Sequence, residues 1–157
     1  IPGFRHWLDN KMKELDSKAE AELLTATDRK ALALAAGTGN EPASLQTLLQ
    51  TPDWYQKPDL AKALKNPLRR LCARYLAKEK RDSGSAYDRV ANFHLTNGSR
   101  IERLNWLADT SANGLKQSAG MMVNYLYKLD DIETNHEVYR GEGKVITSSS
   151  IKTLLKG

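Results

Sequence analysis

One histidine stands out among the residues of this chain that could do chemistry. His94 lies in the stretch Asn-Phe-His-Leu-Thr-Asn-Gly at positions 92–98, with an apolar residue on each side. Histidine exchanges a proton near neutral pH, and its surroundings decide which form dominates. The Asn97-Gly98 pair supplies the positive φ that a helix C-terminus or a hairpin turn requires. From this stretch alone, His94 is either a general acid aimed by a fixed turn or a hydrogen-bonded core histidine.

The other reactive residue types give weaker signals. His6 and His136 stand at no metal-ligand spacing from His94, and no HxxxH or HExxH motif occurs, so we expect no metal site. The run 148–150, three serines, predicts a helix cap rather than a nucleophile, although a catalytic triad assembled by the fold stays open. Cys72 is the only cysteine; its place on an apolar helical face predicts a buried, unreactive thiol.

Length and composition indicate one globular domain. The chain has 157 residues, of which 40% are hydrophobic and 27% charged. No run of 18 apolar residues occurs, so we expect no membrane span and no membrane partner. The start, Ile-Pro-Gly-Phe, has neither an initiator methionine nor a basic and apolar leader, so we expect no secretory signal and a chain that continues upstream of Ile1.

Positive charge is concentrated in one segment. The net charge is +5, and residues 57–89 hold ten Lys or Arg against four Asp or Glu, a net charge of +6. Such a segment either attracts an anionic partner, such as a nucleic acid or a phosphate-bearing cofactor, or forms a solvated helix face. Because no ladder of alternating aromatic and arginine residues accompanies it, we favour the solvated face and expect no nucleic-acid partner.

Residues 1–80 show helical periodicity interrupted by turn signals. Apolar residues repeat at helical spacing from Phe4 to Leu15, and Thr25 with Asp28 predicts a capped helix that Gly37 ends. Further helices are predicted from Pro42 to Leu49, around 60–64 and over 68–76, with a break at Asn66-Pro67.

Residues 81–157 are predicted to mix short helices and strands. Asp88 predicts the cap of a helix that reaches Asn97, with Gly98 in the left-handed conformation; a hairpin at Asn97-Gly98 is the alternative. The remaining predicted elements are strands at 101–107, 121–127, 138–139 and 145–146, a polar loop at 130–136, a capped short helix or a turn at 112–118, and a helix at 148–155. In the strand 121–127, Val123, Tyr125 and Tyr127 share one face. Helices followed by a small sheet indicate an α+β fold.

Five stretches, in order along the whole chain, resemble the malonyl-CoA decarboxylase family. They are Ile-Pro-Gly-Phe (1–4), Pro-Leu-Arg-Arg-Leu-Cys-Ala-Arg-Tyr-Leu (67–76), Val-Ala-Asn-Phe-His-Leu-Thr-Asn-Gly (90–98), Asn-Trp-Leu-Ala-Asp-Thr-Ser (105–111) and Gly-Met-Met-Val-Asn-Tyr-Leu-Tyr (120–127). The resemblance implies an acetyltransferase-like (GNAT-like) catalytic domain. Residues 1–80 would be a helical segment inserted in it, and residues 81–157 its C-terminal part. The family's catalytic serine and main CoA-binding loop would precede Ile1, so we expect residues 1–157 alone to be inactive.

The resemblance also implies the site and its chemistry. It makes His94 the catalytic proton donor in contact with substrate and Tyr127 a supporting residue, although a tyrosine of the core explains the pattern of Tyr127 equally well. The implied enzyme is a carbon–carbon lyase of fatty acid metabolism that converts malonyl-CoA to acetyl-CoA and carbon dioxide without a cofactor. The implied partners are malonyl-CoA, the upstream part of the same enzyme and further copies of it in a homo-oligomer, in the cytoplasm. Two alternatives remain: an acyl-CoA-dependent N-acyltransferase of the same fold, and a non-catalytic basic module that binds nucleic acid.

Overall fold

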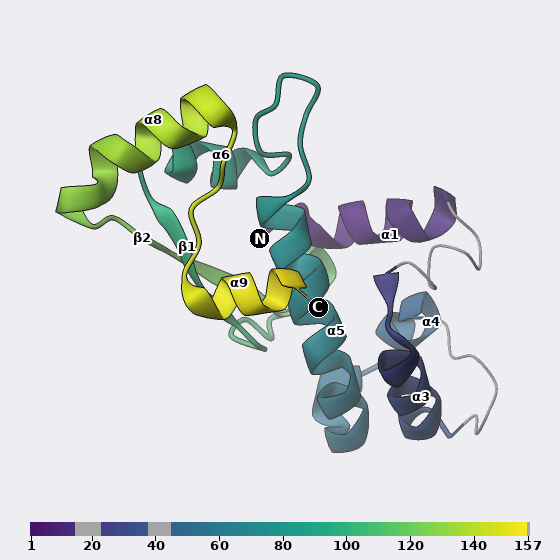
Figure 1. Ribbon diagram of the computed structural model, residues 1–157. Helices are drawn as coiled ribbons and strands as arrows, with labels where there is room; N and C mark the ends of the chain where they lie inside the picture. Colours follow the sequence, from purple (N-terminus) through teal and green to yellow (C-terminus); the bar gives the residue numbers. More distant parts are fainter. Residues whose placement is uncertain (15–22, 38–44, 157) are drawn as a thin grey trace.

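The computed structural model describes residues 1–14, 23–37 and 45–156, where helices precede a small sheet (Figure 1). The first half contains α1 (Phe4–Glu14), α3 (Ala26–Ala35), α4 (Leu45–Gln50), the short 3-10 helix η1 (Trp54–Gln56) and α5 (Pro58–Ala77). The second half contains α6 (Arg89–Thr96), β1 (Arg100–Asn105), α7 (Ala112–Ser118), β2 (Met122–Leu126), η2 (Leu129–Asp131), α8 (Ile132–Glu142) and α9 (Ser149–Lys156). The fold is α+β, as the order of the predicted elements indicated.

The longest described helix, α5, runs through the middle of the molecule (Figure 1). The predicted break at Asn66-Pro67 is wrong, because Pro67 lies inside this helix and is buried. A proline there removes one backbone hydrogen bond and costs about 3 kcal/mol. The apolar face continues past it through the buried side chains of Leu60, Leu64, Leu68 and Leu71. Burial of each leucine contributes about 1.5–3 kcal/mol, which outweighs the cost of the proline.

Helix α6 begins and ends where the local sequence predicts. The Asp88 carboxylate accepts a hydrogen bond from the Ala91 backbone N–H at 2.8 Å, which caps the first turn. At the other end Gly98 has a φ of +89°, and its N–H donates to the Leu95 carbonyl at 3.1 Å. The chain then enters β1 at Arg100. The helix is therefore confirmed, and the alternative hairpin at Asn97-Gly98 is wrong.

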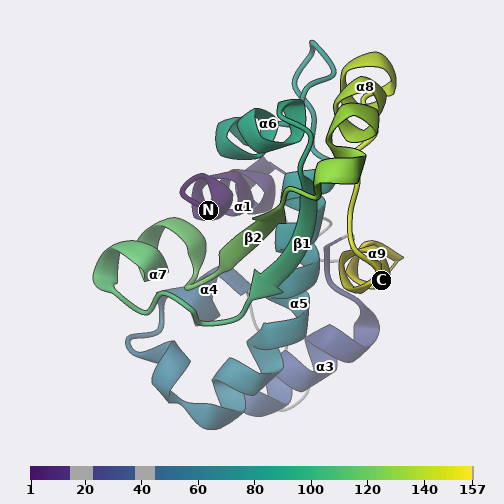
Figure 2. The same ribbon diagram turned by 90° about the vertical axis from the view of Figure 1, so that its left-hand side faces the viewer.

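The sheet has two antiparallel strands among the described residues. Ile101 lies opposite Tyr125 and Leu104 opposite Val123, with an irregularity between Ile101 and Arg103. Along the other edge of β1, a single parallel bridge joins Ile101 to Thr147. The strand predicted at 145–146 does not form; this bridge lies directly after it in the chain. Figure 2 shows one face of both strands with no helix in front of it. The predicted strands at 101–107 and 121–127 are confirmed, with bounds that differ by one or two residues.

The structure corrects the prediction for the segment after β2. Residues 130–136 were predicted as a polar loop and residues 138–139 as a strand, but both ranges are helical. They lie in η2 and α8. Asn135 and Tyr139, four residues apart on one helical face, are both buried. The Tyr139 hydroxyl donates to the side-chain carbonyl of Asn92 at 2.6 Å, which ties α8 to α6. These contacts with α6 and its turn favour a helix that the polar local sequence did not indicate.

The remaining predicted helices are confirmed where the structure describes them. Thr25 and Asp28 form a reciprocal capping box at the start of α3, and Gly37 follows the helix with a φ of +73°. Ser111 caps α7, and the Ser148 hydroxyl caps α9 by accepting from the Ile151 N–H at 3.4 Å. The predictions that involve Leu15 and Pro42 lie outside the described residues.

One buried core includes side chains from both halves of the chain. It contains Phe4 and Leu8 of α1, Leu68 of α5, Ile101 of β1 and Ile151 of α9. The division into an inserted segment, 1–80, and a C-terminal part, 81–157, stays a prediction. None of the described helices combines the length and the apolar character that crossing a membrane requires.

Gly98 gives the first testable prediction. A Cβ at Gly98 would collide with the backbone carbonyl and side chain of Ile132, and its φ is +89°. Gly84 has a similar φ of +85° but no atom within 4 Å of an added Cβ. We expect Gly84→Ala to lower the free energy of unfolding by about 1 kcal/mol through backbone strain alone, and Gly98→Ala to lower it by several times as much. Urea unfolding of both variants measures the difference, and equal losses would contradict the steric argument.

Candidate active site

His94 lies on α6, on the side of the helix that faces β2. The imidazole is partly exposed and lies among apolar side chains. Val90 and Phe93 of the same helix are 48% and 62% exposed, so this part of the surface is unusually apolar. A core histidine, one of the two possibilities that the sequence left open, does not fit this position.

Tyr127, the first residue after β2, reaches His94 from the sheet. Its hydroxyl oxygen lies 2.6 Å from Nδ1 of His94. The two residues are 33 positions apart in sequence, and the antiparallel pairing of β2 with β1 brings them together. Tyr127 is 40% exposed, which does not fit a core tyrosine. The structure therefore brings both sequence-predicted site residues into one hydrogen-bonded pair, although their catalytic roles stay predictions.

Tyr125 is a neighbour of His94 that sequence reasoning did not place in the site. Its ring stacks on the imidazole, with centroids 4.2 Å apart and planes inclined by 17°. The two-residue period of a strand put Tyr125 on the same face as Tyr127, which was the available signal. That signal was missed because a tyrosine inside a strand is usually explained by packing alone.

The surroundings of His94 favour its neutral form. Desolvation of the ring lowers the pKa of His94 from its ordinary value, because burial disfavours the charged imidazolium. In the neutral ring one nitrogen carries a proton and the other accepts one. The 2.6 Å contact allows two arrangements: the Tyr127 hydroxyl donates to an unprotonated Nδ1, or a protonated Nδ1 donates to the hydroxyl oxygen. The structure gives Nε2 no hydrogen-bond partner among the described residues.

A buried polar contact fixes the start of the helix that carries His94. One carboxylate oxygen of Asp88 accepts from the Ala91 N–H, and the other accepts from the Tyr75 hydroxyl at 2.9 Å. Asp88 is 6% exposed, so both bonds lie inside the protein. Burial, and then the nearby Asp88 charge, raise the pKa of Tyr75, which keeps its hydroxyl protonated and able to donate. Helix α6 is thereby anchored to α5.

Other candidate residues have structural explanations. His136 contacts the Thr96 carbonyl at the end of α6, and His6 pairs with Asn10 on α1. The Ser148 hydroxyl donates to the Glu102 carbonyl at 2.6 Å while it caps α9. Burial raises the pKa of the Cys72 thiol, as expected of an unreactive core cysteine. In the ranges that the structure covers, no cluster of three or more His, Cys, Asp or Glu could hold a metal ion.

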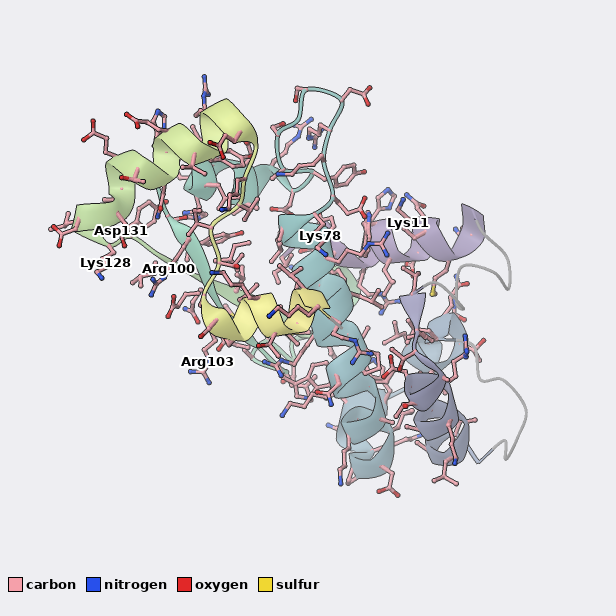
Figure 3. All side chains as sticks on the ribbon, in the orientation of Figure 1. Lys11, Lys78, Arg100, Arg103, Lys128 and Asp131 are labelled. Atoms are coloured by element: carbon pink, nitrogen blue, oxygen red, sulfur yellow. The ribbon has the colours of Figure 1, made fainter. Side chains whose placement is uncertain are left out.

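Much of the positive charge of segment 57–89 is used within the chain. Its internal contacts are Arg70 with Asp28, Arg74 with Glu79, Lys78 with the Leu155 carbonyl, Lys80 with the Gly143 carbonyl and Arg81 with the Tyr87 carbonyl. Other cations lie on different elements: Figure 3 shows Lys11 on α1, and Arg100 and Arg103 on β1. This distribution fits solvated and internally paired cations better than a nucleic-acid surface.

Comparison with protein families identifies what the chain is similar to. Residues 1–157 match the family model described as the malonyl-CoA decarboxylase C-terminal domain. A mitochondrial malonyl-CoA decarboxylase from the goose Anser anser anser is 40% identical over 155 residues, and one from Mus musculus is 40% identical over 156. These alignments cover 96% and 99% of this chain but only 30% and 31% of the relatives. The chain therefore spans less than a third of the curated relatives it matches.

Solved structures give the same result. The crystal structure of malonyl-CoA decarboxylase from Rhodopseudomonas palustris matches 98% of this chain with 40% identity and a TM-score of 0.79, over 31% of its own length. That from Agrobacterium vitis matches 98% of this chain with 39% identity and a TM-score of 0.77, over 33% of its length. The similarity thus includes the fold as well as the sequence.

The electrostatics of the site predict how His94 titrates. We expect His94 in the folded protein to titrate below its ordinary pKa of about 6.5. The folded state then binds the proton more weakly than the unfolded state does. The part of the free energy of unfolding that depends on a neutral His94 is therefore fully present above a pH of about 6.5 and is lost as the pH falls through the lower pKa of the folded state. NMR titration of the His94 ring, with urea-unfolded protein as the reference, measures both values. A midpoint at or above the unfolded reference would contradict the desolvation argument.

Proposed function

Because the chain belongs to the malonyl-CoA decarboxylase family, we propose that it supplies part of the active site of a lyase that converts malonyl-CoA to acetyl-CoA and carbon dioxide. The observation that carries the proposal is the His94–Tyr127 pair, with its 2.6 Å contact, on a partly exposed surface. Both residues lie in stretches by which the sequence resembles the family.

The reaction needs three things from a protein. The bond between the α-carbon of malonyl-CoA and its carboxylate must break, and its electron pair passes into the thioester as an enolate while carbon dioxide leaves. The enolate oxygen must be stabilised, and the α-carbon must receive a proton to give acetyl-CoA. The thioester carbonyl accepts the electrons, so the expectation of no cofactor follows from the substrate. Positioned hydrogen-bond donors and a general acid are the groups that such a reaction uses.

His94 is the proposed source of the proton. In the proposed tautomer the Tyr127 hydroxyl donates to Nδ1 and the neutral ring carries its proton on Nε2, and a thioester enolate is a strong enough base to take that proton. The Tyr127 hydroxyl at Nδ1 can return a proton to the ring as Nε2 loses its own. A positioned general acid contributes about 10²–10⁴-fold to the rate. The apolar neighbours Val90 and Phe93 would keep water away from the enolate once substrate covers them.

Several expectations complete the proposal. They are a GNAT-like catalytic domain, a serine and a CoA-binding loop ahead of Ile1, an inactive isolated piece 1–157, and assembly into a homo-oligomer. The relatives, about three times as long as the alignment, support the idea that residues outside this chain complete the site. The relatives from goose and mouse are named mitochondrial, whereas the bacterial proteins carry no compartment in their names, and a cytoplasmic location for this chain stays a prediction. Neither the N-acyltransferase nor the nucleic-acid module gains support from the comparisons.

A substitution of His94 tests the proposed function. In a protein of the relatives' full length that carries this chain, we expect His94→Asn to lower turnover of malonyl-CoA by at least about 10²-fold, because the proton donor is lost. The assay supplies malonyl-CoA without an amine acceptor and measures carbon dioxide and acetyl-CoA. His6→Asn, an exposed histidine on α1, is the matched control and should retain wild-type turnover. Near-wild-type decarboxylation by folded His94→Asn would remove His94 from the mechanism.

Removal of the Tyr127 hydroxyl tests the other member of the pair. Tyr127→Phe retains the ring and deletes only the hydrogen bond to Nδ1. We expect kcat to fall by about tenfold, as the loss of one hydrogen bond to a reacting group predicts, with little change in thermal stability. Tyr55→Phe on η1 removes a hydroxyl elsewhere and serves as the control. An unchanged kcat would assign Tyr127 a packing role.

A further inference from the structure

Three aromatic rings surround His94, and Tyr125 contacts it in a different way from the others. Phe93 and Tyr127 meet the imidazole by their edges, with planes inclined by 80° and 61° and centroids 5.3 and 5.8 Å away. Tyr125 lies parallel to the imidazole at 4.2 Å. Among the described residues it is the ring that covers a face of His94.

A face contact restrains a motion that the Tyr127 hydrogen bond leaves free. The hydrogen bond fixes the position of Nδ1, but the imidazole can still tilt about that point. The torsion that turns a histidine ring is broad and has no sharp minima of its own. A second plane at van der Waals distance removes that freedom. Nδ1 and the ring plane together determine the direction in which Nε2 points.

We propose that Tyr125 is a positioning residue for His94, whose ring face holds the imidazole in the plane that lets Nε2 reach the substrate. The proposal rests on the proposed function of His94. It gives the alternate tyrosines of the β2 segment separate tasks: Tyr127 binds a nitrogen of the ring, and Tyr125 sets the plane. Tyr125 is well suited to this task because β2 holds it directly opposite the fully buried Ile101.

The ring of Tyr125, rather than its hydroxyl, carries this role. The hydroxyl oxygen is buried and has no hydrogen-bond partner in the part of the chain that the structure describes. Because this oxygen is buried, it is not accessible to a substrate at His94. Burial also raises the pKa of Tyr125, so the hydroxyl stays neutral. A phenylalanine in place of Tyr125 should therefore retain kcat, whereas an aliphatic residue should lower it.

Two substitutions at Tyr125 separate the ring from the hydroxyl. In a protein of the relatives' full length, Tyr125→Phe retains the stacking face, and Tyr125→Leu retains an apolar side chain without a flat face. Both are measured for kcat, KM and thermal unfolding, and the His94 pKa is measured by NMR. Should Tyr125→Leu not fold, Tyr125→Met replaces it, since methionine also lacks a flat face and adapts its shape.

We expect Tyr125→Phe to match the wild type in kcat and in the His94 pKa. Tyr125→Leu should lower kcat by about tenfold with KM nearly unchanged, because a misdirected ring affects the chemical step rather than binding. Its His94 pKa should rise toward the ordinary value, because water reaches the uncovered face. A tyrosine that only fills the core would lower stability without moving the His94 pKa.

Three results would overturn the proposal. The first is an unchanged His94 pKa in Tyr125→Leu, and the second is an unchanged kcat in that variant. The third is a decrease of kcat in Tyr125→Phe as large as that in Tyr125→Leu. The proposed function fails separately, when His94→Asn retains turnover. In that case the NMR comparison decides by itself whether Tyr125 holds the imidazole.

Discussion

The turn at Gly98 is the constraint on which the arrangement of the site depends. Its φ of +89° and the close approach of Ile132 leave room for no side chain. Helix α6 ends at Thr96, two residues before Gly98, and β1 begins at Arg100, two residues after it. The Gly98 carbonyl also accepts from the buried Asn135 side chain at 3.2 Å, which holds α8 against the same point. Helix α6, strand β1 and helix α8 therefore meet at one residue.

The helices of the first half support the site from the other end of α6. Tyr75 of α5 lies within 6.0 Å of Phe4 and 5.3 Å of Trp7 between ring centroids, so three aromatic side chains from α1 and α5 pack together. The Tyr75 hydroxyl binds the Asp88 carboxylate that caps α6. A buried carboxylate requires such partners, because an unpaired one would be costly inside the protein. The position of His94 thus depends on helices that are distant from it in sequence.

The chemistry of the site follows from its apolar and aromatic surroundings. His94 has apolar and aromatic neighbours, and desolvation favours its neutral ring. Five of the ten cations of the basic segment 57–89 contact acidic side chains or backbone carbonyls elsewhere in the chain. A neutral imidazole with a defined proton donor suits a reaction that makes a reactive carbanion, because an apolar setting keeps competing water away. Tyr125 and Tyr127 would then supply geometry and a proton, respectively.

Local sequence determined the elements whose ends carry their own capping groups. Asp88 and Gly98 define α6, Thr25 and Asp28 start α3, and Ser111 starts α7, because each cap binds the backbone within a few residues. The motif around His94 likewise placed that residue on its helix, and the predicted strand 121–127 placed Tyr127 one residue beyond the end of β2. Side-chain contacts between distant segments decided the rest. Packing on the core carries α5 through Pro67, and contacts with α6 make a helix of residues 132–142. The stacking of Tyr125 on His94 exists only once β2 pairs with β1, since 31 residues separate the two rings in sequence.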